Sequence, residues 1–176
     1  MLQGKKLRLR ALEPSDTEVL YRWENSSSAW LVSGTLTPFS KHVIAQYISS
    51  SHNDIYINRQ LRLMLEPPGA DPVGCIDLFD FDPANRRAGV GILIGDVSQR
   101  RKGYASEALS LLRDYCFGVL HLHQLYAHIA AGNKESMGLF IKCGFEESGV
   151  LKQWSYQRER WIDEHIMQCI NKNTRT

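Results

Sequence analysis

The stretch that decides the fold runs over residues 91–109 and reads GILIGDVSQRRKGYASEAL. Its apolar start belongs to a strand that we predict over residues 86–94. From Tyr104 to about residue 119, apolar side chains recur at the spacing of a helix with one buried face. Three consecutive cations and a glycine lie between these two elements. The stretch therefore predicts a strand, a cationic loop and a helix in immediate succession.

The loop has the composition of an anion-binding site. Arg100, Arg101 and Lys102 supply positive charge, and Gly103 lets a ligand approach the backbone closely. The first N–H groups of a helix lack partners within the helix, so they can bond phosphate oxygens. A phosphorylated ligand is one interpretation of this pattern. The other is a solvated basic turn with glycine at the helix entry, because Arg-x-x-Gly-x-Ala often arises by chance.

Two other phosphate-binding motifs are absent from this region. A Walker loop requires Gly-x-x-x-x-Gly-Lys-Ser/Thr, but the fifth residue after Gly95 is Arg100. A dinucleotide fingerprint that began at Gly89-x-Gly91 would need a third glycine where Ile94 stands. The sequence therefore argues against a Walker-type nucleotide site and against a nicotinamide-binding fold.

Length and composition limit the setting of this loop. A chain of 176 residues can bury a core, and we expect one domain over residues 1–176 with its core over about 7–170. The 21 basic and 19 acidic residues leave a net charge of +2, which argues against a nucleic-acid partner. The four cysteines are too widely spaced for a Cys-x-x-Cys motif or a disulfide framework. Because no run has the pattern of a signal peptide or a membrane span, we expect a cytoplasmic location and no membrane partner.

Strand and helix patterns alternate along the chain. Helices are predicted around Val19–Trp23 and Val43–Ile48, over about 104–119, and over 135–143. Strands are predicted over 7–11, 59–66, 73–81, 86–94, 124–131, 145–150 and 158–170. This order predicts an α/β fold with a mixed sheet.

A second motif follows the strand at 124–131. Its spacing is Asn-x-x-Ser-x-x-Leu-Phe-x-x-x-Gly-Phe, formed by Asn133, Ser136, Leu139, Phe140, Gly144 and Phe145. Together with the strand and the cationic loop of residues 91–109, it resembles the GCN5-related N-acetyltransferase (GNAT) family. Within that family, it is similar to the branch that acetylates ribosomal-protein N-termini or polyamines. The resemblance extends from Leu7 to about Cys169.

The resemblance implies a single-domain fold whose central sheet is mixed, mostly antiparallel, flanked by helices and splayed at an acyl-CoA site. The backbone of the 92–94 strand would pair with the pantetheine amides of acetyl-CoA, and the N–H groups of residues 101–105 would cradle its pyrophosphate. The expected cofactor-binding residues are Ile92, Leu93, Ile94, Arg100, Arg101, Lys102, Gly103, Tyr104, Ala105, Asn133, Ser136 and Phe140. For Asn133, a helix N-cap is an equally good interpretation, since a helix follows it directly.

The positions expected to complete the chemistry depart from the family pattern. In many relatives, the residue at Phe140 is a tyrosine that protonates the leaving thiolate, and the residue at Gly89 is a glutamate that deprotonates the amine. We therefore leave the catalytic residues unknown and name Asp77, Glu24 and Ser136 as weak candidates. Solvated surface charge is the more ordinary interpretation of Asp77 and of Glu24.

No metal site is expected. His121 and His123 fall at the end of a helix, where the dipole favours a cation, and His128 is an isolated histidine on a strand. We expect acetyl-CoA as cosubstrate and no metal.

The expected function is transfer of an acetyl group from acetyl-CoA to a primary amine by direct attack. The acceptor would be a peptide N-terminus, an amino acid or a small aminated metabolite, and Trp30 and Trp154 would border its cleft. Residues 26–47 contain no Asp or Glu, which counts against a polyamine acceptor. The alternatives are an acyl-CoA-binding module without catalysis and a polyamine acetyltransferase. A homodimer is the assembly to be tested.

Overall fold

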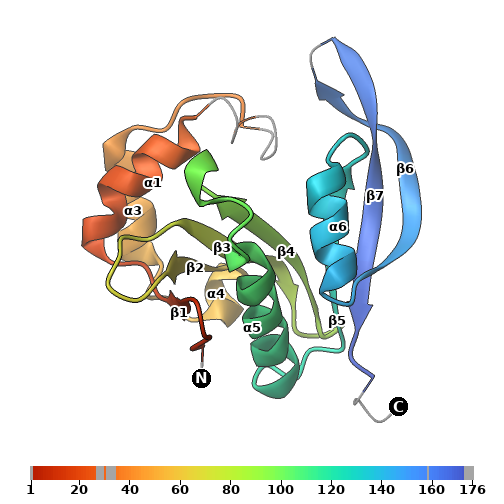
Figure 1. The fold of residues 1–176 in the computed structure, drawn as a ribbon, viewed down its shortest axis with the longest axis horizontal. Coiled ribbons are helices and arrows are strands. Elements are labelled where there is room, and N and C mark those ends of the chain that lie inside the picture. The colour runs from red at the N-terminus through yellow and green to blue at the C-terminus, as the bar shows by residue number, and fades with distance from the viewer. Residues whose placement is uncertain (1, 27–29, 31–34, 158, 173–176) are drawn as a thin grey trace.

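The computed structural model describes residues 2–26, 30, 35–157 and 159–172. Seven strands form one sheet in the order β1-β2-β3-β4-β5-β7-β6 (Figure 1). Their bounds are β1 Arg8–Arg10, β2 Leu61–Glu66, β3 Gly74–Asp82, β4 Arg87–Ile94, β5 Gln124–Ala130, β6 Glu146–Gln157 and β7 Arg160–Ile170. Neighbouring strands are antiparallel except for β4 and β5, which are parallel. The predicted α/β fold with a mixed, mostly antiparallel sheet is confirmed.

Helices cover both faces of the sheet. The helical elements are η1 Pro14–Asp16, α1 Thr17–Glu24, α3 Lys41–Ser50, α4 Ile55–Asn58, η2 Val97–Gln99, α5 Tyr104–Gly118 and α6 Lys134–Lys142. Buried residues of α5 and α6 pack with Ile76, Ala88 and Leu125 in the larger core. Buried residues of α1 and α3 pack with Met64 and Cys75 on the opposite face. The two faces are called below the α5 face and the α1/α3 face.

Two elements differ from the sequence prediction. The strand predicted to end at residue 150 continues to Gln157, because β6 pairs with β7 along the whole hairpin. The extension contains polar and apolar side chains, and many of them are exposed. Its sequence therefore lacks the alternation of apolar and polar residues that predicts a strand. The short helix α4 was not predicted; it begins where the side chain of Asp54 accepts the N–H of Tyr56 at 2.8 Å, and four residues are too few for a helical pattern.

The sheet opens between its two parallel strands. Pairing between β4 and β5 covers only Arg87 with Gln124, Ala88 with Leu125, and Gly89 with Tyr126. Beyond Gly89, β4 continues to Ile94 and remains paired to β3 on its other side. The splay predicted beside the 92–94 strand is therefore present, and it divides the sheet into a β1–β4 part and a β5–β6 part.

Candidate functional site

The separation of β4 from β5 leaves a strand edge inside the sheet. Ile92, Leu93 and Ile94 lie along this edge and are half-buried. Their register partners lie on β3 only, so the backbone groups that face β5 have no strand partner within the described residues. Buried or half-buried backbone groups of this kind need a hydrogen-bonding partner, and an extended amide-containing chain supplies one.

The cationic loop leads directly into α5. Gly103 is the N-cap of α5 and has φ +87, a left-handed conformation that favours glycine. The first backbone bond of α5 joins the N–H of Glu107 to the carbonyl of Gly103 at 3.1 Å. The N–H groups of residues 104–106 therefore have no partner inside the helix and can receive an anion.

The side chains of the loop are exposed and only weakly engaged. Arg101 contacts Glu135 at 3.0 Å, a pair whose side chains are both largely solvated. Lys102 donates to the side-chain oxygen of Gln99 at 2.8 Å, and Arg100 is exposed. Exposed ion pairs stabilise the fold little, so these cations can be redirected toward a phosphate at low cost.

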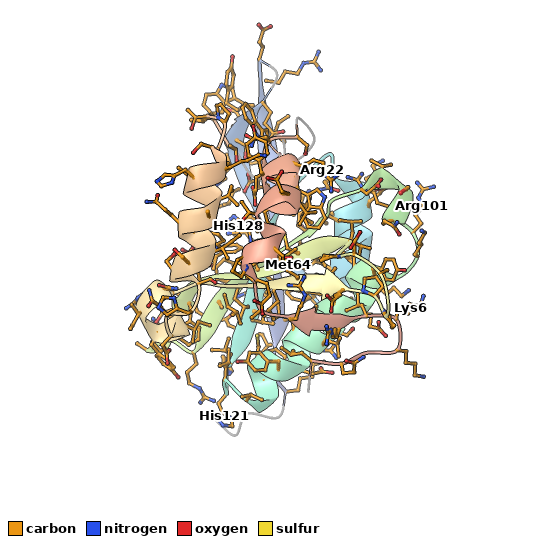
Figure 2. All side chains as sticks on the ribbon, turned by 90° about the vertical axis from the view of Figure 1, so that its left-hand side faces the viewer. Lys6, Arg22, Met64, Arg101, His121 and His128 are labelled. Carbon is orange, nitrogen blue, oxygen red and sulfur yellow. The ribbon has the colours of Figure 1, made fainter. Side chains whose placement is uncertain are left out.

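The N-terminal segment supports the loop, which the sequence did not indicate. Lys6 Nζ donates to the carbonyl of Lys102 at 2.7 Å. The carboxylate of Glu107, in the first turn of α5, accepts the backbone N–H groups of Lys5, Lys6 and Leu7 at 2.8, 2.8 and 3.1 Å. Lys6 and Arg101 lie on the same side of the molecule, away from His128 (Figure 2). Lys6 therefore adds a fourth cation to the loop.

The surroundings of Gly103 have the chemistry that a pyrophosphate site requires. A Cβ at this position would lie 2.7 Å from Lys6 Nζ, so any side chain here would enter the space between the loop and its nearest ammonium group. Free helix N–H groups, a glycine without Cβ and several cations are the features that a phosphate site requires. The residues present therefore suit the group that the sequence predicts.

The second motif forms α6 and the turn after it. The side chain of Asn133 accepts the N–H of Ser136 at 3.1 Å, so the N-cap role is realised. Asn133 Nδ2 has no hydrogen-bond partner within the described residues, so a contact with a pantetheine arm remains a prediction. Gly144 has φ +90 after the end of α6, which is the conformation expected of a C-terminal glycine.

Phe140 is a core residue in this structure. Its side chain is 2% exposed and packs edge-on against Phe145, with ring centroids 4.9 Å apart. A ring with so little accessible surface cannot make a broad contact with a ligand unless α6 moves. Phe140 therefore packs in the core, and its contact with the cofactor stays a prediction.

The two carboxylates named as weak catalytic candidates meet at one arginine. Arg62 on β2 binds Asp77 through two hydrogen bonds of 2.6 and 2.9 Å and contacts Glu24 at 2.5 Å. All three side chains are less than one-fifth exposed, so the interpretation of Asp77 and Glu24 as solvated charges is wrong. Tyr47 covers the cluster, with its ring centre 5.4 Å from the guanidinium.

The cluster combines two carboxylates with one guanidinium, a formal charge of −1, and all three side chains are largely buried. Burial raises the pKa of the Asp77 carboxyl, and Arg62 opposes that rise. Burial acts to lower the pKa of Arg62, but Asp77 raises it above its ordinary value. Because Arg62 binds both oxygens of Asp77, this carboxylate is poorly placed to accept a proton from a substrate.

The position that holds a glutamate in many relatives is closed in this chain. A Cβ at Gly89 would lie 2.3 Å from the ring of Phe79, and that ring packs edge-on with Tyr126 at a centroid distance of 6.1 Å. Phe79 therefore takes the space that a side chain at position 89 would need. Position 89 therefore supplies no base in this chain.

The two tryptophans predicted at the acceptor cleft have different surroundings. Trp30 is half-buried, and its indole N–H donates to the carbonyl of Glu24 at 2.7 Å, which places it beside the Arg62 cluster. Trp154 lies on β6 and is 60% exposed. A contact of Trp154 with an acceptor stays a prediction.

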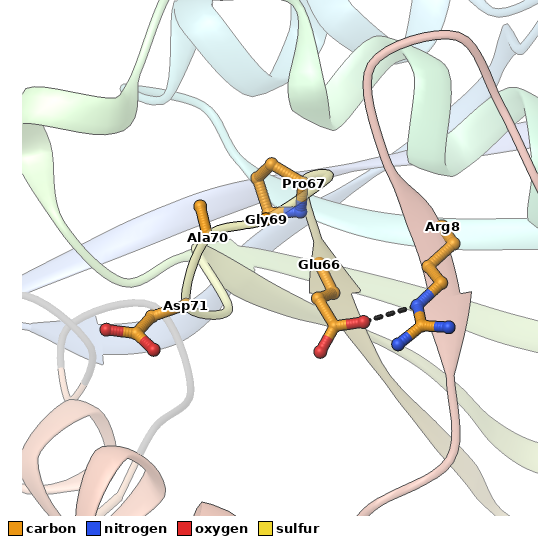
Figure 3. A pocket seen from close by; sticks show the side chains of 6 residues that line it. All are labelled: Arg8, Glu66, Pro67, Gly69, Ala70 and Asp71. Atoms are coloured by element: carbon orange, nitrogen blue, oxygen red, sulfur yellow. Dashed lines mark hydrogen bonds and ion pairs between the residues drawn. The ribbon is translucent and has the colours of Figure 1, made fainter.

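Two surface hollows differ in their position relative to the opening. One, of about 620 Å³, lies beside Arg8, Glu66 and the turn at 67–71 (Figure 3); it is at the β1 edge of the sheet, distant from the opening. The other, of about 550 Å³, lies on the α1/α3 face and includes Tyr126 and His128. Only the second shares strands with the opening.

Other predictions concern cysteines, metals and membranes. Cys75, Cys116, Cys143 and Cys169 are free and buried. Among the described residues, no group of three or more His, Cys, Asp or Glu side chains is placed to hold a metal ion. In the same part of the chain, no helix has the length and apolar character needed to cross a bilayer.

Comparison with known proteins points to one family. The family model described as an acetyltransferase (GNAT) domain matches residues 6–146. The chain is 28% identical to spermidine N(1)-acetyltransferase of Vibrio cholerae over 170 residues, covering 95% of this chain and 94% of that protein. It is also 28% identical over 174 residues to an uncharacterised N-acetyltransferase, p20, of Bacillus licheniformis, covering 97% and 96%.

A solved structure agrees with this match. The crystal structure of spermidine N-acetyltransferase from Vibrio cholerae in complex with CoA and spermine superimposes with a TM-score of 0.86 at 25% identity, over 95% of this chain and 96% of that one. A structure of the same enzyme in an intermediate state, with a TM-score of 0.78 and 25% identity over 95% of both chains, is dodecameric.

Proposed function

This chain belongs to the GNAT acetyltransferase family, and on this premise we propose that it acetylates a primary amine that reaches the β4/β5 opening from the α1/α3 face. The observation that supports this direction is the arrangement of charge around the opening. The cationic loop lies at the start of α5, and the Asp77–Arg62–Glu24 cluster lies on the opposite face. A polyanion and a cationic amine can therefore approach from different sides.

The chain's own residues hold the cosubstrate in three places. The free backbone edge at 92–94 pairs with the pantetheine amides, residues 101–105 cradle the pyrophosphate, and Lys6 adds charge to that cradle. Bound acetyl-CoA supplies an activated acetyl thioester. A backbone N–H in the opening, at Ile92 or Leu93, stabilises negative charge on the reacting carbonyl oxygen.

The acceptor we favour is a small cationic amine, with spermidine as the first to test. Two carboxylates share one guanidinium in the cluster, which leaves one negative charge in excess beside the opening. The relatives that act on spermidine match along almost the whole chain. The absence of acidic residues from 26–47 predicts weaker binding of a long polyamine than those relatives achieve.

Release of CoA thiol in the presence of acetyl-CoA tests the activity. Spermidine, spermine, peptides with a free N-terminus and single amino acids are compared, and mass spectrometry identifies the acetylated product. We expect the highest kcat/KM for a polyamine. If peptide N-termini were much better acceptors, the polyamine assignment would be wrong while the transfer reaction stood. Thermal stabilisation by acetyl-CoA without thiol release from any amine would instead favour a binding module without catalysis.

Location and assembly complete the proposal. The location that we propose, from the sequence, is the cytoplasm. A homodimer, or a larger assembly such as that of the dodecameric Vibrio cholerae enzyme, is tested by light scattering on the purified chain.

A further inference from the structure

His128 lies at the level where β4 and β5 separate. The last paired residues are Gly89 and Tyr126, and His128 follows Tyr126 by two positions on β5. Because alternate residues of a strand share a face, His128 lies on the same face as Tyr126. Asp77 is on that face too, since it pairs with Gly91 across β3 and β4. His128 and Asp77 therefore flank the opening on the α1/α3 face.

A carboxylate on the next strand orients this histidine. His128 Nδ1 lies 3.3 Å from Glu164 Oε2, and Ser155 donates a hydrogen bond to the other oxygen of Glu164. The side chains of His128 and Glu164 are 35% and 17% exposed. His128 Nε2 has no hydrogen-bond partner within the described residues. With Nδ1–H donating to the carboxylate, Nε2 is left as the proton acceptor.

The neighbouring strand leaves room for a ligand beside His128. A Cβ built at Gly91 would touch only the edge of Phe79, at 3.8 Å, so β4 presents no side chain between His128 and Asp77. The hollow of about 550 Å³ on this face includes His128 in its lining. The β4 residue that lines this hollow is Arg87, two positions before Gly89, so an acceptor in it lies next to His128 and close to the start of the β4/β5 opening.

We propose that His128 is the general base of the acetyl transfer and that Glu164 is its positioning residue. This assignment rests on the proposed function. The acceptor arrives as an ammonium ion, and His128 Nε2 takes one of its protons. The amine nitrogen then bonds to the acyl carbon while the carbon–sulfur bond breaks, with its electron pair remaining on sulfur. The thiolate takes the surplus N–H proton through water, and His128 returns its own proton to solvent.

Several other groups face the same hollow and bear on any pH dependence. Tyr126 donates to Asp80 at 3.3 Å and packs edge-on against the imidazole, with centroids 5.8 Å apart. Arg87 contacts Asp82 at 3.3 Å. The titratable and charged groups that surround His128 on this face are Glu164, Tyr126, Asp80, Asp82, Arg59 and Arg87.

The test compares His128→Asn with a matched control on the same sheet. His165 on β7 forms a similar pair, with Nδ1 2.9 Å from Glu147, but its position between Glu164 and Ile166 places it on the other face. We expect His128→Asn to lower kcat/KM for the best amine by about 100-fold or more near neutral pH, the usual contribution of a general base. His165→Asn should keep wild-type activity, and both variants should keep the wild-type affinity for CoA.

The pH profile and a second variant separate chemistry from structure. In His128→Asn, the rate should continue to rise with pH until the amine itself is deprotonated, because only free amine can then react. Glu164→Gln should lower kcat by a smaller factor than His128→Asn, with little change in KM. In this variant the imidazole of His128 is still present, but its hydrogen bond to residue 164 is weaker. Equal activity of wild type and His128→Asn, or a uniform loss at all pH values, would overturn the assignment. Wild-type protein that acetylates no amine would overturn the proposed function itself.

Discussion

Substitution of Gly103 by alanine tests whether the loop before α5 is the CoA pyrophosphate site. Gly103 has φ +87, and a Cβ there would lie 2.7 Å from Lys6 Nζ. The left-handed conformation costs a residue with a Cβ about 1–2 kcal/mol. Displacing Lys6 from the Lys102 carbonyl costs about a further 1 kcal/mol. In the variant without CoA, the loop can relax and avoid these two costs, but CoA binding must restore its shape. The sum of about 2–3 kcal/mol then weakens CoA binding about 30- to 150-fold.

Isothermal titration of CoA measures this loss, with two glycines as controls. Gly69 has φ +68 and open space around it, so Gly69→Ala should cost about 1–2 kcal/mol of stability without affecting CoA. Gly118, at the end of α5, also has open space and has no positive φ, so Gly118→Ala should leave affinity unchanged. A Gly103→Ala affinity within threefold of the wild type would refute the assignment of the loop.

Three further substitutions test the support of the site and of the fold. Asp16 is 3% exposed and binds Arg10, which keeps its ion pair with Glu66, so Asp16→Ala should lower the free energy of unfolding in urea by about 1–3 kcal/mol. Burial raises the pKa of Asp16, but Arg10 and a backbone N–H lower it below its ordinary value, so the difference from wild type should shrink as pH falls below about 4. In Gly89→Glu, the new Cβ would lie 2.3 Å from the ring of Phe79, so we expect a loss of about 1–3 kcal/mol of stability and no gain in kcat. A variant that is more active and equally stable would contradict this prediction. Glu107→Gln weakens three hydrogen bonds from the N-terminal segment, so we expect a lower Tm and a lower affinity for CoA. Unchanged affinity in calorimetry would mean that this segment does not shape the loop.

The features that the sequence predicted are those that a local signal specifies. Gly103 before a helix with a regular apolar stripe predicted both the N-cap and the start of α5, because capping depends on adjacent residues. The N-cap interpretation of Asn133 at the start of α6 depended on the same kind of local signal. The opening beside the 92–94 strand was inferred only through the family resemblance, since no alternation pattern predicts where two strands separate.

The features that were missed join distant parts of the chain. Glu107 binds backbone N–H groups about 100 residues earlier, Arg62 reaches Glu24 over 38 residues, and Glu164 reaches His128 over 36. The third contact depends on the strand order, which places β5 next to β7, and the first two depend on how α5 and α1 pack against the N-terminal segment and β2. His128 was interpreted as an isolated histidine because its partner is on β7, which α6 and β6 separate from β5 along the chain.

The cationic loop and the carboxylates near the opening lie on different sides of the sheet, which the overall composition does not reveal. A net charge of +2 suggested no strong preference for any partner, because it sums over both faces. The loop before α5 presents Arg100, Arg101 and Lys102, whereas the α1/α3 face places Asp77, Glu24 and Glu164 around the opening. A polyanionic cosubstrate is favoured on the first side and disfavoured on the second, and a cationic amine has the opposite preference. The two substrates are therefore brought to the same opening without competing for one surface, and only their reactive ends need to meet where β4 leaves β5.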